Sequence, residues 1–371
     1  MEPIKLGLLA PLSGPTASSG QAIERGMILA IQEINEAGGV LERPLELVIR
    51  NIPNKRAAED TRHLRSLLEE EKVMAVFGGT FDGVTHSNLE LIHQQKVPFI
   101  NIWGTVTQAV KNEYEPNYIF CISMTDGEAS KFLARYGVNL VGIHKPSILA
   151  DTSDWGEAST TELVRQLEAL NVPPVHIERF DIGERNMTKQ LEKLQAAGAD
   201  SIFLIGGPEE STAVMRGRAT LSWNTPILSQ WGTGNRAFME KTGIQNTGQL
   251  YVLQTFSFAG ARSPQSEQLL KAYHEQFATS SPGEIDEPMG VAHGYDAVYL
   301  LVKAIEQGQT ITGSIVKDAL EHLQEPYNGV LKQHIRPFSP ENHIALNEND
   351  YMMAIWQNGR LVPAPRPRLE N

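Results

Sequence analysis

Apolar positions along the chain recur in two alternating patterns. Short, nearly continuous apolar runs, of which residues 4–10 form the first, are typical of buried strands. The segments between these runs carry apolar residues every three or four positions, which predicts helices with one buried face. The first such face is formed by Ile23, Met27, Ala30, Ile31 and Ile34.

Two series of alternating strands and helices follow one another, and the second begins near residue 125. Strands separated by amphipathic helices in this way predict parallel sheets that are covered on both faces. One of the helices is expected near residues 84–95, and a mostly helical stretch is expected near residues 264–325. Asn358-Gly359 between two apolar runs predicts a hairpin. The expected strands are residues 4–10, 45–49, 73–77, 97–102, 147–150, 175–177, 201–205 and 226–228.

Composition agrees with a globular α/β protein of two lobes. The 371 residues are about twice the ~150 that one domain commonly takes. Hydrophobic residues make up 41% of the chain, and the net charge is −12, from 32 basic and 44 acidic residues. An acidic balance argues against a nucleic-acid partner, which is normally bound by a basic face. No apolar run approaches the ~20 residues of a membrane span, so we expect no membrane insertion.

The single cysteine, Cys121, excludes an intrachain disulfide framework and a multi-thiolate metal site. It fits a reducing and an oxidising compartment equally. The N-terminus has no charged region, long apolar region or cleavage site of a signal peptide. Either the protein stays in the cytosol, or a leader has been removed.

Catalytic templates are mostly missing. The chain has no GxxxxGK[ST] phosphate loop, no GxGxxG after the first strand, no HExxH and no GxSxG. Residues 151–154 resemble the start of a calcium loop but lack its later glycine and glutamate. We therefore expect a protein that is not an enzyme and uses no cofactor or metal. Enzymatic activity stays a third hypothesis, which rests only on polar loops.

The loops after strands carry the candidate ligand-binding residues, because ligands of such sheets bind outside the carboxyl ends of strands. Residues 78–83 follow a strand and open a helix, so their N–H groups can hold an anion. Residues 102–105, 151–156 and 230–234 also follow strands. The candidates are Thr80, Phe81, Asp82, Trp103, Gly104, Thr105, Trp155, Gln230 and Trp231.

Three of the five tryptophans, Trp103, Trp155 and Trp231, fall in these loops. Each of them alone can simply seal a sheet edge. A crevice lined by three indoles around an apolar or aromatic ligand explains all three together. Burying some 200 Å² of ligand supplies roughly 5 kcal/mol, whereas micromolar affinity needs about 8 kcal/mol. Hydrogen bonds or a charge pair must supply the rest.

Several blocks of the sequence resemble the type I periplasmic solute-binding proteins, in particular the Leu/Ile/Val-binding branch that serves ABC importers. The resemblance covers nearly the whole chain and implies two doubly wound α/β lobes joined by three crossovers. It places residues 1–123 and 255–330 in lobe 1, and residues 124–254 and 331–371 in lobe 2. The blocks are residues 4–15, 37–47, 96–100, 154–156 and 294–298.

The resemblance also implies a function. A small-molecule ligand would lie between the lobes, which close around it by hinge motion, and a membrane ABC permease would be the partner. It implies a cleaved signal peptide and a periplasmic or extracytoplasmic location. A cytosolic ligand-sensing regulator on the same fold is the alternative, motivated by the missing leader. Tyr251, Phe256 and Phe258 lie near the return crossover, where they contact ligand or pack the hinge.

One position departs from the family pattern. Relatives that bind amino acids hold the ligand carboxylate in two lobe 1 loops, which correspond here to residues 80–82 and 103–105. The acidic residue that pairs with the ligand ammonium is replaced by Trp231, whose π face attracts a cation by only ~0.5–2 kcal/mol. We therefore expect an aromatic or bulky carboxylate held by Thr80 and Thr105. An ammonium on Asp82 keeps amino acids as the alternative.

Overall fold

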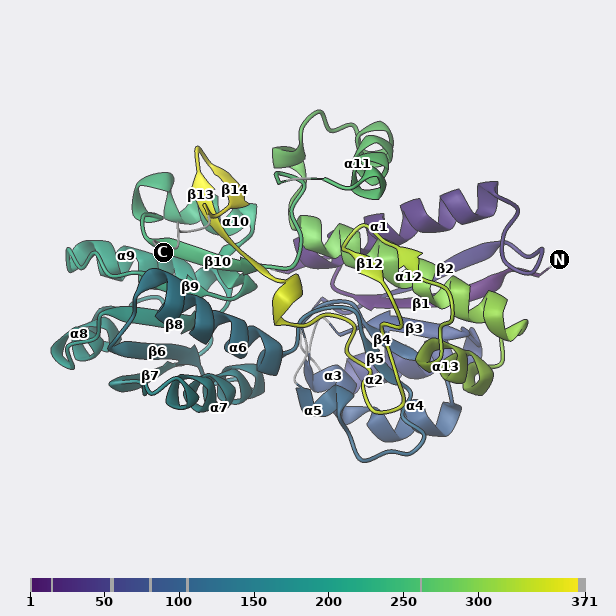
Figure 1. Cartoon of the computed structure of the whole chain (residues 1–371), viewed down its shortest axis with the longest axis horizontal. Coiled ribbons are helices and arrows are strands. Elements are labelled where there is room, and N and C mark those ends of the chain that lie inside the picture. Colours follow the sequence, from purple (N-terminus) through teal and green to yellow (C-terminus); the bar gives the residue numbers. More distant parts are fainter. Residues whose placement is uncertain are drawn as a thin grey trace. The chain divides into compact units, whose positions relative to one another are not determined.

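The computed structural model describes residues 2–14, 16–53, 57–79, 82–104, 107–260 and 262–365. The chain forms two compact units and passes between them three times, as predicted. Unit 1 comprises Met1–Thr125 and Ala261–Asn347, and unit 2 comprises Asp126–Gly260 and Glu348–Asn371 (Figure 1). None of the helices in these described ranges is both long and apolar enough to cross a membrane.

Unit 1 is built on one sheet of five parallel strands in the order β2-β1-β3-β4-β5. Figure 1 shows α1 and α12 on one face and α2 to α5 on the other. The strands are β1 (Ile4–Ala10), β2 (Leu45–Asn51), β3 (Ala75–Gly78), β4 (Phe99–Asn101) and β5 (Ile119–Cys121). The helices are α1 (Ala17–Glu36), α2 (Ala57–Arg65), α3 (Asp82–Ser87), α4 (Leu89–Gln95), α5 (Thr107–Val110), α11 (Pro264–Phe277), α12 (Pro288–Gly308) and α13 (Gly313–Glu321).

The two faces of this sheet are covered differently. Leu64 of α2 and Ile92 of α4 belong to an apolar core with β-strand residues such as Phe99. On the other face, α1 and α12 approach backbone to backbone, since a Cβ on Gly26 would lie 2.0 Å from the carbonyl oxygen of Val291. Glycine is therefore required where these helices cross.

Unit 2 contains five parallel strands extended by an antiparallel hairpin, in the order β14-β13-β10-β9-β8-β6-β7. The hairpin turn is the predicted one, with φ of +52° at Asn358 and +73° at Gly359. The strands are β6 (Pro146–Asp151), β7 (His176–Phe180), β8 (Ser201–Ile205), β9 (Ile227–Ser229), β10 (Leu250–Gln254), β13 (Met352–Gln357) and β14 (Arg360–Pro363). The helices are α6 (Asp126–Tyr136), α7 (Asp154–Ala169), α8 (Thr188–Ala196), α9 (Pro208–Thr220) and α10 (Arg236–Thr242).

The largest difference from the expected domain boundaries concerns one segment. Residues 331–347 were predicted for the second lobe, but they lie in unit 1. Polar contacts hold them there, because the backbone N–H of Leu331 donates to the Asp296 carboxylate at 2.9 Å. A short hairpin, β11 (Tyr327–Asn328) with β12 (Gln333–His334), begins the segment. The other predicted boundaries, at 123 and 254, precede the observed crossings by two and six residues.

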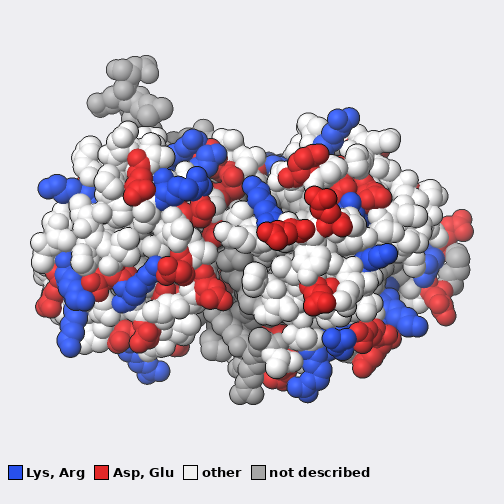
Figure 2. All heavy atoms as spheres, turned by 90° about the horizontal axis from the view of Figure 1, so that it is seen from below, with Lys and Arg blue, Asp and Glu red and all other residues white. Residues whose placement is uncertain are grey.

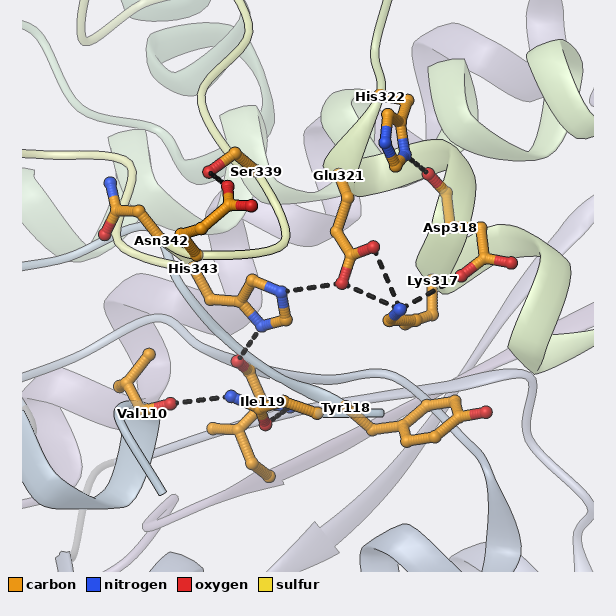
Figure 3. Close-up of polar contacts among 12 residues, drawn as sticks. Val110, Tyr118, Ile119, Lys317, Asp318, Glu321, His322, Ser339, Asn342 and His343 are labelled. Atoms are coloured by element: carbon orange, nitrogen blue, oxygen red, sulfur yellow. Dashed lines mark hydrogen bonds and ion pairs between the residues drawn. The ribbon is translucent and has the colours of Figure 1, made fainter. Parts of the chain in front are cut away.

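The end of this segment is fixed by a buried charged cluster drawn in Figure 3. The two ring nitrogens of His343 lie 2.8 Å from the Ile119 carbonyl oxygen and 2.9 Å from Glu321 Oε1. Lys317 forms an ion pair with the same Glu321 oxygen at 2.8 Å. The backbone beside His343 also bonds to β5, since Ala345 N–H donates to the Cys121 carbonyl at 2.9 Å. The last stretch of chain before the third crossing is therefore anchored to α13 and β5.

Two further details differ from the sequence-based prediction. The single helix expected near residues 84–95 is divided into α3 and α4 by a break at Asn88. The strands β5 and β10 were not predicted at all. Three apolar residues at 119–121 are too few to produce a recognisable period.

Candidate functional site

The carboxyl ends of β3, β4 and β5 lie side by side in unit 1. Gly78 pairs with Asn101, and Asn101 pairs with Cys121, so the loops that follow these strands leave the sheet at one edge. Parallel α/β sheets bind ligands at this edge. The loops 78–83 and 102–105, chosen from the sequence, are therefore neighbours.

Asn101 joins these strand ends. Its side chain is fully buried, accepts a hydrogen bond from the Thr85 hydroxyl at 3.2 Å and donates one to the Phe120 carbonyl at 3.1 Å. Gly79 has a φ of +92°, and a Cβ there would lie 2.5 Å from the Asn101 amide oxygen. The backbone before the predicted anion-binding loop is thus fixed by one amide and one glycine.

Trp103 and Gly104 follow β4 and are half-buried. The indole packs against α12, because its Cζ3 atom lies 3.0 Å from the position that a Cβ on Gly290 would take. One turn further along α12, His293 Nδ1 donates to the carbonyl oxygen of Ile102 at 3.1 Å. Burial lowers the pKa of His293 to about 4, so the ring that holds this loop is neutral at pH 7.

The structure does not describe the side chains of the other four predicted residues in unit 1. Thr80, Phe81 and Thr105 lie outside the described residues. Asp82 is the first residue of α3, and only its backbone is described. Their proposed part in holding a carboxylate stays a prediction.

In unit 2 the corresponding edge is formed by the ends of β6, β8 and β9. Ala150 pairs with Ile205, and Leu204 pairs with Ser229. The loop after β6 is used to start a helix, since Ser153 Oγ accepts the N–H of Gly156 at 3.2 Å. The Asp151 carboxylate in turn accepts both the N–H and the hydroxyl of Ser153. Over the described ranges, no group of three or more His, Cys, Asp or Glu side chains is arranged to hold a metal.

Trp155 and Gln230, predicted from separate loops, are in direct contact. The Trp155 Nε1–H donates to Gln230 Oε1 at 3.2 Å, and Gln230 Nε2 donates to the Ser159 hydroxyl at 3.3 Å. Gln230 is only 1% exposed, whereas Trp155 is half-buried. A buried amide therefore fixes the orientation of an indole that keeps free surface at this edge.

Trp231 is placed differently from the other two tryptophans. Only 8% of it is exposed in the chain. The turn that carries it, η3 (Trp231–Thr233), packs on the end of β8, where a Cβ on Gly232 would lie 1.9 Å from the Gly206 carbonyl oxygen. Trp356 of the hairpin donates to the Thr233 carbonyl at 2.9 Å. The predicted contact of Trp231 with ligand stays a prediction, beside the interpretation that this tryptophan seals the sheet edge.

The aromatic residues near the return crossover pack within unit 2. The rings of Phe256 and Phe258 meet edge to face with centroids 4.7 Å apart, and they are 7% and 2% exposed. Tyr251 lies in β10 with its ring centroid 6.0 Å from that of Tyr136. These contacts favour packing over ligand contact for all three.

Three residues that support the site, Asn101, Ser159 and His293, were not among the predicted ones. They act through the strand ends and the indoles, and they lie inside strands and helices rather than in loops. A usable signal exists for two of them. Asn101 is a polar residue that ends an apolar strand, and His293 is a titratable residue on a mostly apolar helix.

A family model and a curated relative each match most of this chain. The model of the family described as periplasmic binding protein matches residues 3–360. The leucine-, isoleucine-, valine-, threonine- and alanine-binding protein of Pseudomonas aeruginosa is 24% identical over 325 residues, which cover 85% of this chain and 82% of that protein.

Solved structures share the fold. A periplasmic binding protein type 1 from Bordetella pertussis superimposes with a TM-score of 0.87 at 18% identity, covering 98% of this chain and all of that one. The substrate-binding protein LivJ from Streptococcus pneumoniae in complex with isoleucine gives 0.82 at 21% identity, covering 98% and 99%. A solute-binding protein from R. palustris in complex with 4-hydroxybenzoate also gives 0.82, at 18% identity, covering 97% and 95%. The type I fold predicted from the sequence is thereby confirmed.

Proposed function

Because this chain belongs to the periplasmic binding protein family, whose members are non-enzymatic solute-binding proteins of ABC transporters, we propose that it captures an aromatic or bulky carboxylate. It delivers this ligand to a membrane ABC permease and acts in the periplasm or another extracytoplasmic space. The observation that carries the proposal is the half-buried indole of Trp155, fixed by Gln230 at the carboxyl edge of the unit 2 sheet.

The choice of ligand follows from the chemistry of both edges. In this proposal the carboxylate binds to N–H groups and hydroxyls of the loops at residues 80–82 and 103–105, as an anion does at a helix N-terminus. The apolar body of the ligand packs on Trp103 and Trp155. An indole contact contributes about 0.5–1.5 kcal/mol beyond the burial of area, and only when the ligand is itself aromatic. A ligand ring is therefore favoured over an aliphatic side chain.

Relatives support both the proposal and its alternative. One structural relative holds 4-hydroxybenzoate and another holds isoleucine, so ligands of both classes fit this fold. The position where amino-acid binders carry an acid is Trp231, which offers no counter-charge to an ammonium. Amino acids stay the alternative, with their ammonium on Asp82.

The proposal is tested by thermal shift with 4-hydroxybenzoate, benzoate, phenylalanine and leucine at equal concentrations. A ligand that binds only the folded protein stabilises it by about 2.7 kcal/mol at a hundredfold excess over Kd. We expect the two aromatic acids to raise the Tm most. A larger shift with leucine than with every aromatic acid would refute the aromatic preference and leave the alternative.

Replacing Trp155 by alanine is expected to weaken binding of the best ligand about tenfold, which corresponds to about 1.4 kcal/mol. Trp155→Phe keeps a ring but removes the N–H that bonds to Gln230, so we expect an intermediate loss. Isothermal titration measures both variants, with the Tm of the free protein as a control for folding. Unchanged affinity in Trp155→Ala would remove this residue from the site.

A further inference from the structure

A pocket in unit 2 lies against α9 and shares no lining residue with the candidate site described above. Its volume is about 250 Å³. The walls come from the loop before α8, from one face of α9 and from the last turn of α10. The pocket, called the α9 pocket below, is lined by Arg185, Glu209, Thr212, Ala213, Arg216 and Lys241.

The charges around the α9 pocket are unbalanced. Three cationic side chains face one carboxylate, Glu209, although the chain as a whole has a net charge of −12. On the face of the molecule shown in Figure 2, basic and acidic side chains are interspersed. A concave site with two positive charges left over raises the local concentration of anions.

The cations are held in place by contacts within the unit. Lys241 Nζ bonds to Glu209 Oε1 at 2.9 Å, and Arg216 donates to the main-chain carbonyl of Lys241 at 2.5 Å. The hydrogen bond from Lys241 lowers the pKa of the Glu209 carboxyl, and the charge of Arg185 adds to this effect. Glu209 is therefore ionised and neutralises only one of the three cations.

Arg185 has no hydrogen-bond or ion-pair partner for its side chain in the part of the chain that the structure describes. A guanidinium presents a planar fork of N–H donors that matches two oxygens of a carboxylate or a phosphate. The floor of the pocket is uncharged and closed, since Thr212 is 5% exposed and accepts a hydrogen bond from Thr242 at 3.1 Å. The remaining binding capacity is therefore that of two guanidinium groups.

We propose that the α9 pocket binds a small dianion whose charges are carried by oxygen, namely a phosphate group or a dicarboxylate. Two uncompensated guanidinium groups match two negative charges, and a monoanion leaves one of them unpaired. The volume admits such an ion together with several waters, at ~30 Å³ each. This site does not depend on the solute proposed above, because none of its lining residues is among those proposed to hold that solute.

The test is isothermal titration of the purified protein with inorganic phosphate and with succinate, and with acetate as the monoanion, at constant ionic strength. We expect saturable binding of both dianions, weaker binding of acetate, and at least a tenfold loss in the double variant Arg185→Gln/Arg216→Gln. The matched control Arg165→Gln/Lys193→Gln removes two exposed cations of unit 2 outside the pocket and is expected to bind as the unmodified protein does.

Two results would overturn the proposal. One is equal loss of binding in both double variants, which would show general attraction by surface charge. The other is the lack of saturation below about 10 mM for both dianions, because such weak binding is not specific recognition. If the Tm shows that the double variant is unfolded, Arg185→Gln alone serves, since that side chain has no intramolecular hydrogen bond to lose among the described residues.

Discussion

Replacing Asp296 by alanine is expected to lower the free energy of unfolding by about 4 kcal/mol, because removing one member of a buried polar network leaves its partners unsatisfied. The carboxylate is fully buried on α12. Its Oδ1 accepts the Tyr327 hydroxyl at 3.0 Å and the Val330 N–H at 2.8 Å, and its Oδ2 accepts the Leu331 N–H at 2.9 Å. Two backbone N–H groups and a phenol would lose their acceptor together.

Replacing Asp296 is also expected to destabilise the structure locally. A Cβ on Gly329 would lie 2.4 Å from Asp296 Oδ2, so the turn between β11 and β12 wraps directly around the carboxylate. Burial raises the pKa of Tyr327 well above its usual value, and the charge on Asp296 adds to this. The phenol therefore keeps its proton and remains a donor. Without the acceptor, we expect the segment 327–334 to lose protection from hydrogen exchange before the rest of unit 1 does.

The measurement is urea denaturation of Asp296→Ala beside Asp296→Asn, which keeps one acceptor oxygen and the shape of the side chain. We expect the asparagine variant to lose about half as much stability. Glu325→Gln, at an exposed carboxylate of the same unit, is the control and is expected to change stability by less than about 0.5 kcal/mol. A loss below about 1 kcal/mol in Asp296→Ala would contradict the anchoring role.

The same contacts explain which part of the fold could not be predicted from the sequence. Periodicity located most strands of both units, because a buried parallel strand is a nearly continuous apolar run. Residues 331–347 have no such period, and they belong to unit 1 because Asp296 and the His343 cluster bind them. Partners so far apart in sequence leave no local pattern, so the boundary could not be predicted from periodicity.

The candidate site was predictable to the extent that strand topology determines it. The rule that ligands bind at carboxyl ends of strands selected Trp155 and Gln230 independently, and the structure brings them into contact. The rule does not say how deeply each side chain is buried. Trp231 follows β9 as predicted, yet only 8% of it is exposed, and its turn packs on Gly206 and bonds to Trp356 of the hairpin. Burial depends on these distant partners.

Acidification is expected to destabilise the protein through His293, and the sign follows from its pKa. The folded value of about 4 lies below the ordinary value of 6.5, mainly because burial disfavours the charged ring. The unfolded state therefore binds more protons between these pH values. The contribution of His293 to the free energy of unfolding is complete above about pH 6.5 and is lost as the pH falls toward 4. At 1.36 kcal/mol per unit, the loss from this residue reaches about 3 kcal/mol at pH 4.

The variant His293→Asn separates this contribution from the others. Its amide Nδ2 is placed to donate to the Ile102 carbonyl as the imidazole Nδ1 does, but it does not titrate near neutral pH. Burial also lowers the pKa of His93 and of His343, so the variant keeps part of the acid sensitivity. Urea denaturation at pH 7 and pH 4 should show a fall in stability that is about 3 kcal/mol smaller in His293→Asn than in the unmodified protein.

The exposed His322 gives the control variant His322→Asn, for which we expect the unmodified dependence on pH. If His293→Asn and His322→Asn lose equal stability on acidification, a neutral ring does not hold the loop that carries Trp103.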